Sequence, residues 1–243
     1  MSQASDLFAR TALDLPPAFT SFTPSAGIDA FAFACREADR MEAGALVWTP
    51  GRDRLDFAVV LQPEEPLATA RRAFLVCMDA LVHAVASVAP PDKPLRIDWP
   101  DTIRFDGARL GGGRLGWPSG AGEDAEPAFL VFGATLIASK AETGDPGLTP
   151  DSTSLEEEGF EPDCGVALVE AFARHLLRGF DTWQEHSFEA AVIGFLERLS
   201  GRYDRDAKLD AVGNLAGAEA RLDLLPALRA PAWLDERTGS PRL

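Results

Sequence analysis

Hydrophobic and polar positions follow two different periods along this chain, and the two periods predict both strands and helices. Short apolar runs rich in Val, Leu and Phe, typical of strands, occupy residues 45–49, 56–61 and 129–138. Apolar residues recur every three or four positions, as on one face of a helix, within residues 66–89, 169–180 and 188–199. Apart from Thr135, the run at 129–138 is apolar, which favours a central strand buried on both faces.

The stretch 95–118 has the pattern around which we expect the rest of the chain to be organised. It predicts three short strands with a tight turn at Asp106-Gly107, and its last strand contains Gly111, Gly112 and Gly113 in succession. Glycine weakens a strand because it offers no side chain to pack and loses more backbone entropy on ordering. A glycine run therefore indicates a bulge or a place where a ligand lies against the backbone.

The order of these elements predicts an α+β fold with a mixed β-sheet, helices packed on one face and a small β-containing C-terminal appendage. A proline-containing N-terminal arm covers residues 1–27, and the main domain is expected at 28–200. Residues 201–243 form short, turn-rich segments, which we interpret as the appendage. A length of 243 residues is sufficient for one large domain with a substantial core.

Charge and cysteine content limit the function and the location of the protein. The net charge of −15 argues against nucleic acid or an anionic membrane as the main partner. The three cysteines are far apart, which fits neither a disulfide framework nor a pair of metal ligands. The most apolar run is too short to span a bilayer. We therefore expect a cytoplasmic protein with no membrane partner and no metal site.

The candidate site residues gather on neighbouring strands of the predicted sheet. They are Trp99, Asp101, Arg109, Gly111, Gly112 and Gly113, with Arg52 and Arg54 at the tip of the preceding hairpin. Exposed backbone next to several guanidinium groups suits a carboxylate or a phosphate, because arginine presents a planar fork that matches both. The alternative is that the glycines form a bulged edge and the arginines a solvated rim.

The order of the motifs resembles that of biotin-protein ligases. The matching stretches are Asp-Trp-Pro-Asp-Thr-Ile at 98–103, Ala-Arg-Leu-Gly-Gly-Gly at 108–113, Val-Phe-Gly-Ala at 131–134 and Thr-Ser-Leu at 153–155. The resemblance covers about residues 28–199 and extends to the wider group of lipoate ligases and octanoyltransferases. One bacterial branch of this group carries a small extra C-terminal domain, which the end of this chain is similar to.

The resemblance implies a function as well as a fold. Such ligases bind biotin or lipoate, activate its carboxylate with ATP and Mg as an acyl-adenylate, and pass the acyl group to a lysine of a carrier domain. On this basis we expect a biotinyl or lipoyl carrier domain as a partner and biotin, lipoate or octanoate as the small carboxylic acid. The resemblance makes Arg109 the expected catalytic residue, and it places Gly111, Gly112 and Gly113 at the acyl and phosphate end of the ligand. Asp101 becomes a polar or magnesium-facing group, and Arg52 and Arg54 contact phosphate.

Several residues depart from the ligase pattern and leave a second hypothesis open. The family lysines are replaced by Asp98 and Arg109, and the glycine- and arginine-rich loop is reduced to residues 51–54, which are too few to exclude water. The alternative is a catalytically lapsed module that binds a small carboxylate or a carrier domain.

An octanoyltransferase would need a nucleophilic cysteine. Cys164 follows the Ser-Leu element instead of preceding it, which favours a buried, inert thiol. Trp233 is expected to serve packing.

Overall fold

The computed structural model describes residues 13–24, 27–143, 146–201, 203, 206–218 and 220–243. Its centre is a seven-stranded sheet with the order β1-β2-β3-β7-β6-β5-β4. The strands are β1 Thr20–Phe22, β2 Ala45–Pro50, β3 Arg54–Leu61, β4 Leu95–Asp98, β5 Thr102–Phe105, β6 Ala108–Gly116 and β7 Leu130–Ile137. β1 and β2 are parallel and the other neighbours antiparallel, so the sheet is mixed, as predicted. β7 is buried along its whole length at the centre of the sheet, which its continuous apolar sequence predicts.

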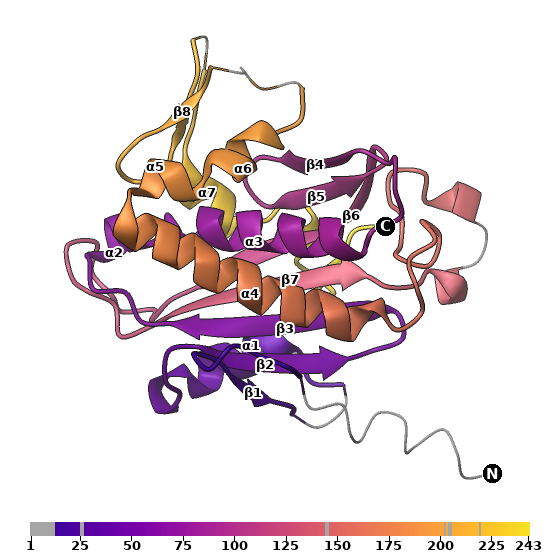
Figure 1. The fold of residues 1–243 in the computed structure, drawn as a ribbon, viewed down its shortest axis with the longest axis horizontal. Coiled ribbons are helices and arrows are strands. Elements are labelled where there is room, and N and C mark those ends of the chain that lie inside the picture. The colour runs from indigo at the N-terminus through magenta and orange to yellow at the C-terminus, as the bar shows by residue number, and fades with distance from the viewer. Residues whose placement is uncertain (1–12, 25–26, 144–145, 202, 204–205, 219) are drawn as a thin grey trace.

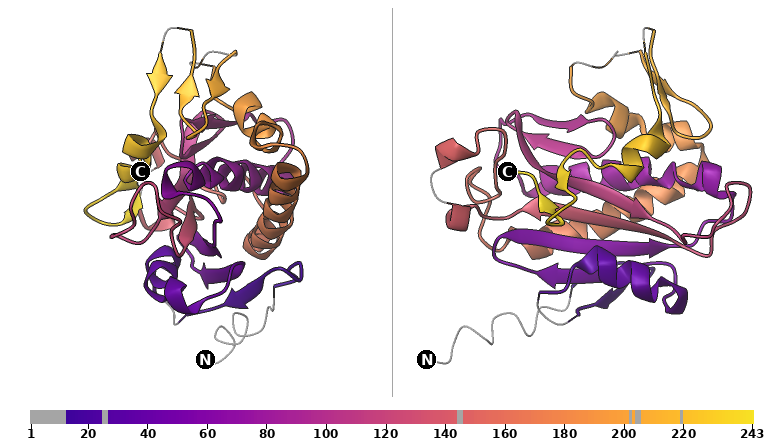
Figure 2. Two further views of the ribbon diagram at one scale, coloured as in Figure 1. Left: turned by 90° about the vertical axis from the view of Figure 1, so that its left-hand side faces the viewer. Right: turned by 180° about the vertical axis from the view of Figure 1, so that it is seen from behind.

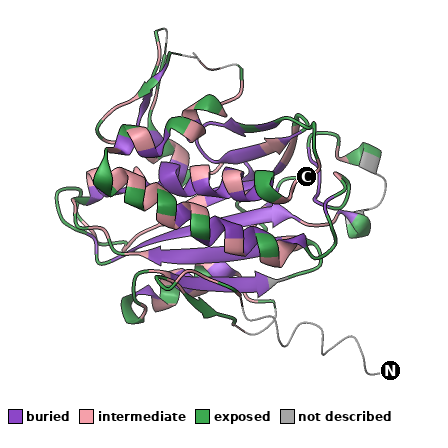
Figure 3. Cartoon of the chain, viewed as in Figure 1, coloured by how far each residue is buried: buried purple, intermediate pink, exposed green. Residues whose placement is uncertain are grey.

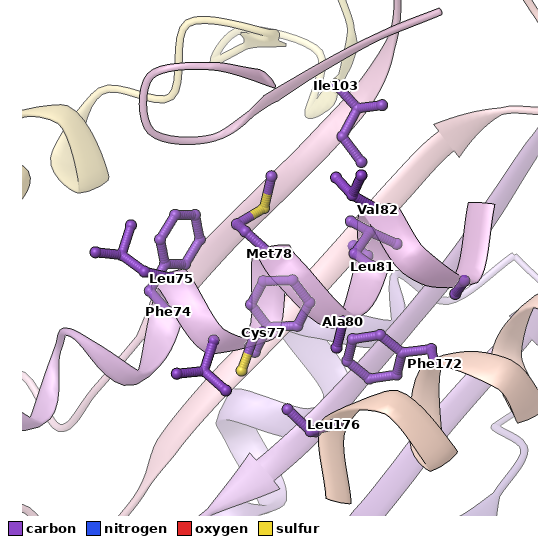
Figure 4. Close-up of a cluster of buried hydrophobic side chains, with 14 of the residues drawn as sticks. Phe74, Leu75, Cys77, Met78, Ala80, Leu81, Val82, Ile103, Phe172 and Leu176 are labelled. Atoms are coloured by element: carbon purple, nitrogen blue, oxygen red, sulfur yellow. The ribbon is translucent and has the colours of Figure 1, made fainter. Parts of the chain in front are cut away.

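Two long helices cover one face of the sheet (Figure 1). α3 spans Ala73–Val88 and α4 spans Cys164–Glu185, and they pack against each other and the sheet. The side chains between them are close-packed, with Phe74 and Met78 of α3 and Phe172 of α4 all fully buried (Figure 4). The predicted helix at 66–89 is divided, because α2, Leu67–Ala70, ends before α3 begins. The last predicted helix is likewise divided into α5, Phe188–Ala191, and α6, Ile193–Glu197.

The opposite face of the sheet has a smaller cover. α1, Ala30–Glu37, packs on β2, β3 and β7, and the short 3-10 helix η1, Ala38–Arg40, follows it. Asp29 caps α1, because its Oδ1 accepts a hydrogen bond of 2.8 Å from the N–H of Ala32. The C-terminal part of the chain crosses the same face above β6 and β7 (Figure 2, right). We refer to this side of the sheet as the α1 face.

The end of the chain forms the small β-containing region that the sequence predicts. It contains β8 Lys208–Leu209, β9 Leu215–Ala216, β10 Arg221–Leu222, α7 Leu224–Arg229, β11 Leu234–Asp235 and β12 Ser240–Pro241. Leu215, Leu224 and Leu228 are buried in the same cluster as the main core, so this region packs onto the sheet domain. The central strands of the sheet are buried, whereas α4 has exposed residues along its outer side (Figure 3). Residues 232–242, which contain β11 and β12, are called the C-terminal hairpin below.

A long connection joins β7 to α4. The 3-10 helices η2, Ala141–Thr143, and η3, Pro146–Leu148, lie between β7 and α4. Residues 155–159 form hydrogen-bonded turns before α4, and the Oγ of Ser154 accepts the N–H of Glu157 at 3.2 Å. Among the residues described, no helix has the length and apolar character needed to cross a membrane.

Candidate functional site

The glycine run of β6 is required by close contacts on both faces of the sheet. A Cβ at Gly111, whose φ is +150°, would lie 2.1 Å from the carbonyl oxygen of Thr135 on β7. A Cβ at Gly113 would lie 2.5 Å from the Sδ of Met78 on α3. A Cβ at Gly112 would point to the α1 face, 2.4 Å from the Cδ1 of Trp233. The space that the sequence assigns to a ligand over Gly112 is therefore occupied by a side chain of the C-terminal hairpin.

Trp233 is anchored at this position. Its side chain has no solvent exposure, and its Nε1–H donates a hydrogen bond of 3.0 Å to the carbonyl oxygen of Gly113. A buried indole normally satisfies its N–H in this way, because an unpaired buried donor costs free energy. The hairpin is held in register by Arg242, whose N–H donates to the carbonyl oxygen of Trp233 at 2.8 Å. Trp233 therefore packs as expected, but it packs inside the candidate site.

Asp101 holds the hairpin from the turn between β4 and β5. The residue is almost fully buried, and its Oδ2 accepts the backbone N–H of Ala232 at 3.1 Å. Its Oδ1 accepts the hydroxyl of Thr102 at 2.8 Å. Burial raises the pKa of Asp101 to about 6, and these hydrogen bonds oppose the shift only in part. Each carboxylate oxygen of Asp101 thus accepts a hydrogen bond from the chain itself, and one of the two bonds holds the hairpin.

Arg109 contacts the other end of the hairpin. Its Nη1 donates a hydrogen bond of 2.8 Å to the carbonyl oxygen of Arg242. Burial, together with the positive charge of Arg104, lowers the pKa of Arg109, and Asp151 opposes this shift. The acceptor of this hydrogen bond is a neutral carbonyl, so the guanidinium could exchange it for an anionic acceptor, to which it would donate a stronger hydrogen bond.

A row of polar side chains continues from Gly112 across the α1 face. Thr49, Asp56, Thr135 and Gly112 are successive register partners on β2, β3, β7 and β6. Cross-strand partners project from the same face of a sheet. The Oγ1 of Thr49 and the Oδ1 of Asp56 are buried without a hydrogen-bond partner among the described residues. Burial raises the pKa of Asp56, opposed by the Thr135 hydroxyl and the Arg54 guanidinium. This row is the polar part of the site.

Arg114 and Phe31 close the site on the side of α1. The Nη2 of Arg114 forms an ion pair of 2.6 Å with Asp29, the capping residue of α1. Its guanidinium lies 4.3 Å from the centroid of the Phe31 ring, and its Nε is buried without a partner. A Cβ at Gly133 on β7 would lie 2.6 Å from a ring carbon of Phe31. Two glycines of the α1 face, Gly112 and Gly133, thus lie under aromatic side chains of the chain itself.

The structure brings some of the expected residues together and places others elsewhere. Arg54 lies at the site, with its Nε 2.8 Å from Asp56 and its Nη1 3.4 Å from the Oγ of Ser240 in the hairpin. Trp99 packs against Phe195 of α6, with ring centroids 6.0 Å apart, in the main core. Arg52 is exposed in the loop between β2 and β3, and no interaction of the described residues joins it to the site.

Other candidates for chemistry lie outside the site. Burial raises the pKa of Cys164 and raises that of Cys35 to about 11, so neither thiol is suited to act as a thiolate. Within the described ranges, no group of three His, Cys, Asp or Glu side chains has the arrangement of a metal site. A cavity of about 620 Å³ lies against the opposite face, near Leu61 and Trp183, and none of the expected site residues lines it.

The sequence does not predict six residues of the site: Phe31, Thr49, Asp56, Arg114, Thr135 and Trp233. A signal was present for Asp56 and Thr135, because each is a polar residue inside an otherwise apolar strand. No local signal identifies Trp233, because its place depends on how residues more than a hundred positions apart meet.

The fold is that of biotin protein ligases. The crystal structure of the enzyme from Aquifex aeolicus matches with a TM-score of 0.61 at 14% identity, over 81% of this chain and 90% of that one. The enzyme from Leishmania major in complex with biotin matches with a TM-score of 0.52 at 17% identity, over 82% and 94%.

Sequence comparison shows the family directly. The model of the Biotin/lipoate A/B protein ligase family matches residues 15–196, so the chain belongs to this family. A biotin protein ligase-like protein of unknown function from Silicibacter sp. TM1040 is 30% identical and matches with a TM-score of 0.76, over 89% of this chain and 99% of that one. No curated protein sequence matches the chain. The resemblance inferred from the motifs is confirmed.

Proposed function

We propose that this protein binds a small carboxylic acid of the biotin, lipoate or octanoate type on the α1 face of its sheet, and that its C-terminal hairpin occupies the same place when the acid is absent. One observation carries the proposal. Arg109, Asp101 and Gly113, which the ligase resemblance assigns to the ligand site, all hydrogen-bond to the hairpin. Groups expected to hold a ligand are thus occupied by a segment of the chain.

The contacts of the hairpin indicate how an acid would replace it. A carboxylate would accept the hydrogen bond that the carbonyl of Arg242 now accepts from Arg109, and a charged acceptor makes the stronger bond. The body of the acid would take the place of the indole over Gly112. A polar end would reach Thr49 and Asp56, whose buried oxygens have hydrogen-bonding capacity left. The site therefore offers one partner for each part of an amphipathic acid.

We further propose that the bound acid is activated with ATP and passed to a carrier-domain lysine in the cytoplasm, as the family membership favours. Two solved structures support the proposal by their contents: the Aquifex aeolicus enzyme has been seen with biotin and ATP, and the Leishmania major enzyme with biotin. In this chain Arg109 would neutralise charge on the carboxylate and on a phosphate oxygen. Its charge is fixed, and arginine is less adaptable than lysine as charge moves during a reaction.

A second candidate is a binding module without catalysis, which regulates through a carboxylic acid or a carrier domain. Two observations favour this candidate. Trp233 is fully buried over the glycine run, and the two carboxylate oxygens of Asp101 accept hydrogen bonds from Thr102 and Ala232. A site filled in this way favours a protein that binds its ligand in competition with the hairpin and does not turn the ligand over.

The full-length protein and the variants Trp233→Ala and Trp233→Phe test these proposals. Each is incubated with Mg-ATP and biotin, lipoate or octanoate, and pyrophosphate release is measured together with the thermal shift caused by each acid. We expect Trp233→Ala to release pyrophosphate with one acid, and Trp233→Ala combined with Arg109→Ala to lose this activity. Trp233→Phe is the matched control, because it keeps most of the buried apolar volume at the position.

The outcomes separate the two candidates. Pyrophosphate release that depends on Arg109 supports the enzyme. A thermal shift with one acid and no pyrophosphate release contradicts the enzyme and supports the binding module. No thermal shift and no pyrophosphate release by a folded Trp233→Ala variant would overturn both.

A further inference from the structure

A cavity lies on the face of the sheet that α3 and α4 cover, and none of the residues assigned above to the acid site lines it. Its volume is about 620 Å³, within the range of roughly 300–1,000 Å³ that is typical of small-molecule sites. Leu61, at the end of β3, and Leu130, at the start of β7, line the cavity and are register partners. Both side chains contact the core under α3 and α4, so the sheet forms the floor of the cavity.

The C-terminal half of α4 forms an apolar wall that the rest of the protein leaves partly uncovered. Leu176, Phe180 and Trp183 follow one another at helical spacing, and all three line the cavity. Leu176 is buried, whereas Phe180 and Trp183 are only half-buried. Phe19 of the N-terminal arm also lines the cavity and is half-buried. Large apolar side chains that stay partly exposed around one cavity are typical of a binding site.

Arg72 is the only cationic residue among the described residues that line the cavity, and its charge is already compensated. Its Nη2 forms an ion pair of 2.9 Å with Glu65. Its guanidinium carbon lies 5.0 Å from the ring centroid of Trp183 and 5.0 Å from that of Phe188. Aromatic faces attract cations through their quadrupole. Arg72 therefore leaves little positive charge for an anionic ligand.

Acidic side chains outnumber basic ones at the cavity. Glu64 and Glu65 line it together with Arg72. The side chain of Glu64 takes part in none of the ion pairs found among the described residues, and it is exposed, which places it at the mouth of the cavity. A positive charge at the mouth would meet this unpaired carboxylate, whereas a negative charge would be repelled by it.

We propose that this cavity binds a small amphipathic amine, with its apolar body against Leu61, Phe180 and Trp183 and its ammonium group at Glu64. The apolar body supplies most of the affinity, because it covers apolar surface that is now exposed to water. The ammonium group supplies selectivity, because an exposed ion pair contributes little free energy but favours only one sign of charge. The proposal does not depend on the acid site, which lies on the other face of the sheet.

Calorimetric titration of the full-length protein with octylammonium and 1-octanol tests the site, because the two probes share one tail and differ in the head group. We expect saturable binding of both, with octylammonium about two- to fivefold the tighter. Phe180→Ala should weaken the binding of both probes about fivefold or more, because the wall loses a ring. Glu64→Gln should weaken octylammonium alone, to about the affinity of 1-octanol. Glu161→Gln, which removes an exposed carboxylate before α4, is the matched control and should change neither affinity.

Four results would overturn the proposal: no saturable binding of octylammonium, 1-octanol binding as tightly as octylammonium, or wild-type affinity for octylammonium in either Phe180→Ala or Glu64→Gln. Circular dichroism establishes that each variant is folded. If Phe180→Ala does not fold, Leu177→Ala decides in its place, because Leu177 lines the same cavity and is half-buried.

Discussion

The indole of Trp233 covers Gly112 so closely that no other residue fits at position 112. A Cβ there would lie 2.4 Å from the indole Cδ1 and 2.2 Å from the carbonyl oxygen of Asp101. The indole N–H donates to the adjacent Gly113 at 3.0 Å. The glycine run that the sequence resemblance assigns to a ligand is here covered by the chain's own tryptophan.

The substitution Gly112→Ala should therefore destabilise the protein. The new methyl group would overlap both the backbone of Asp101 and the indole, and overpacking of a rigid site typically costs about 1–3 kcal/mol. Urea denaturation measures the free energy of unfolding. Gly120→Ala is the control, because a Cβ at Gly120 meets no atom within 4 Å. Equal stabilities of the two variants would contradict the described packing.

Asp101 should make the protein less stable as the pH rises. Its pKa is raised by burial to about 6 in the folded state, against about 3.9 when unfolded. Between these values the folded state binds more protons, so this contribution is present at low pH and is lost as the pH rises through about 6. The Asp101→Asn variant should not show this loss. Between pH 4 and pH 7, the free energy of unfolding of the wild type should fall by about 2 kcal/mol relative to that of the variant. Parallel profiles of unfolding free energy against pH would contradict the shift.

Asp29 should show the opposite dependence. Burial raises its pKa, but the hydrogen bond and the charge of Arg114 outweigh this effect and leave the pKa lowered. Asp29 therefore stabilises the folded state above the pKa that it has in the unfolded state. This stabilisation is lost as the pH falls through the lower pKa that it has in the folded state. Asp29→Asn keeps a helix cap and loses the ion pair. The variant should be less stable than wild type at pH 7 and should approach it at pH 2.5, as measured by thermal unfolding. A constant difference would show that the ion pair has no role.

The cysteines should be unreactive at neutral pH. Burial raises the pKa of Cys35 to about 11 and raises that of Cys164, and Cys77 is fully buried. Alkylation by iodoacetamide, followed by mass spectrometry, should be slow in the folded protein and fast after unfolding, because the thiolate is the reactive form. Cys164→Ser should leave any acyl transfer unchanged. Rapid alkylation of Cys164 in the folded protein would revive the octanoyltransferase hypothesis.

Much of the sheet could be predicted from local sequence. The apolar run of β7 predicts a buried central strand, and the turn at Asp106-Gly107 predicts the pairing of β5 with β6. Helix boundaries were less accurate, since the periodic pattern at 66–89 continues through the break between α2 and α3. Periodicity reports which face is buried and says little about where a helix is interrupted.

The site was predicted only in part, for a physical reason. Arg109, Asp101 and the glycines lie within one continuous stretch, so their proximity follows from two tight turns. Asp56 joins them only through the register of β3 with β7, and Trp233 only through the path of the C-terminal hairpin. Neither relationship leaves a pattern in the local sequence.

The affinity of the acid for the wild type and for Trp233→Ala tests the central claim most directly. Calorimetric titrations with biotin, lipoate and octanoate compare both proteins, with Trp183→Ala on α4 as a control outside the site. If the hairpin occupies the acid site, Trp233→Ala should bind one acid at least about tenfold more tightly than wild type, because displacing the buried indole no longer opposes binding. Equal affinities in wild type and Trp233→Ala would show that the acid and the indole do not share one place, and would contradict the account.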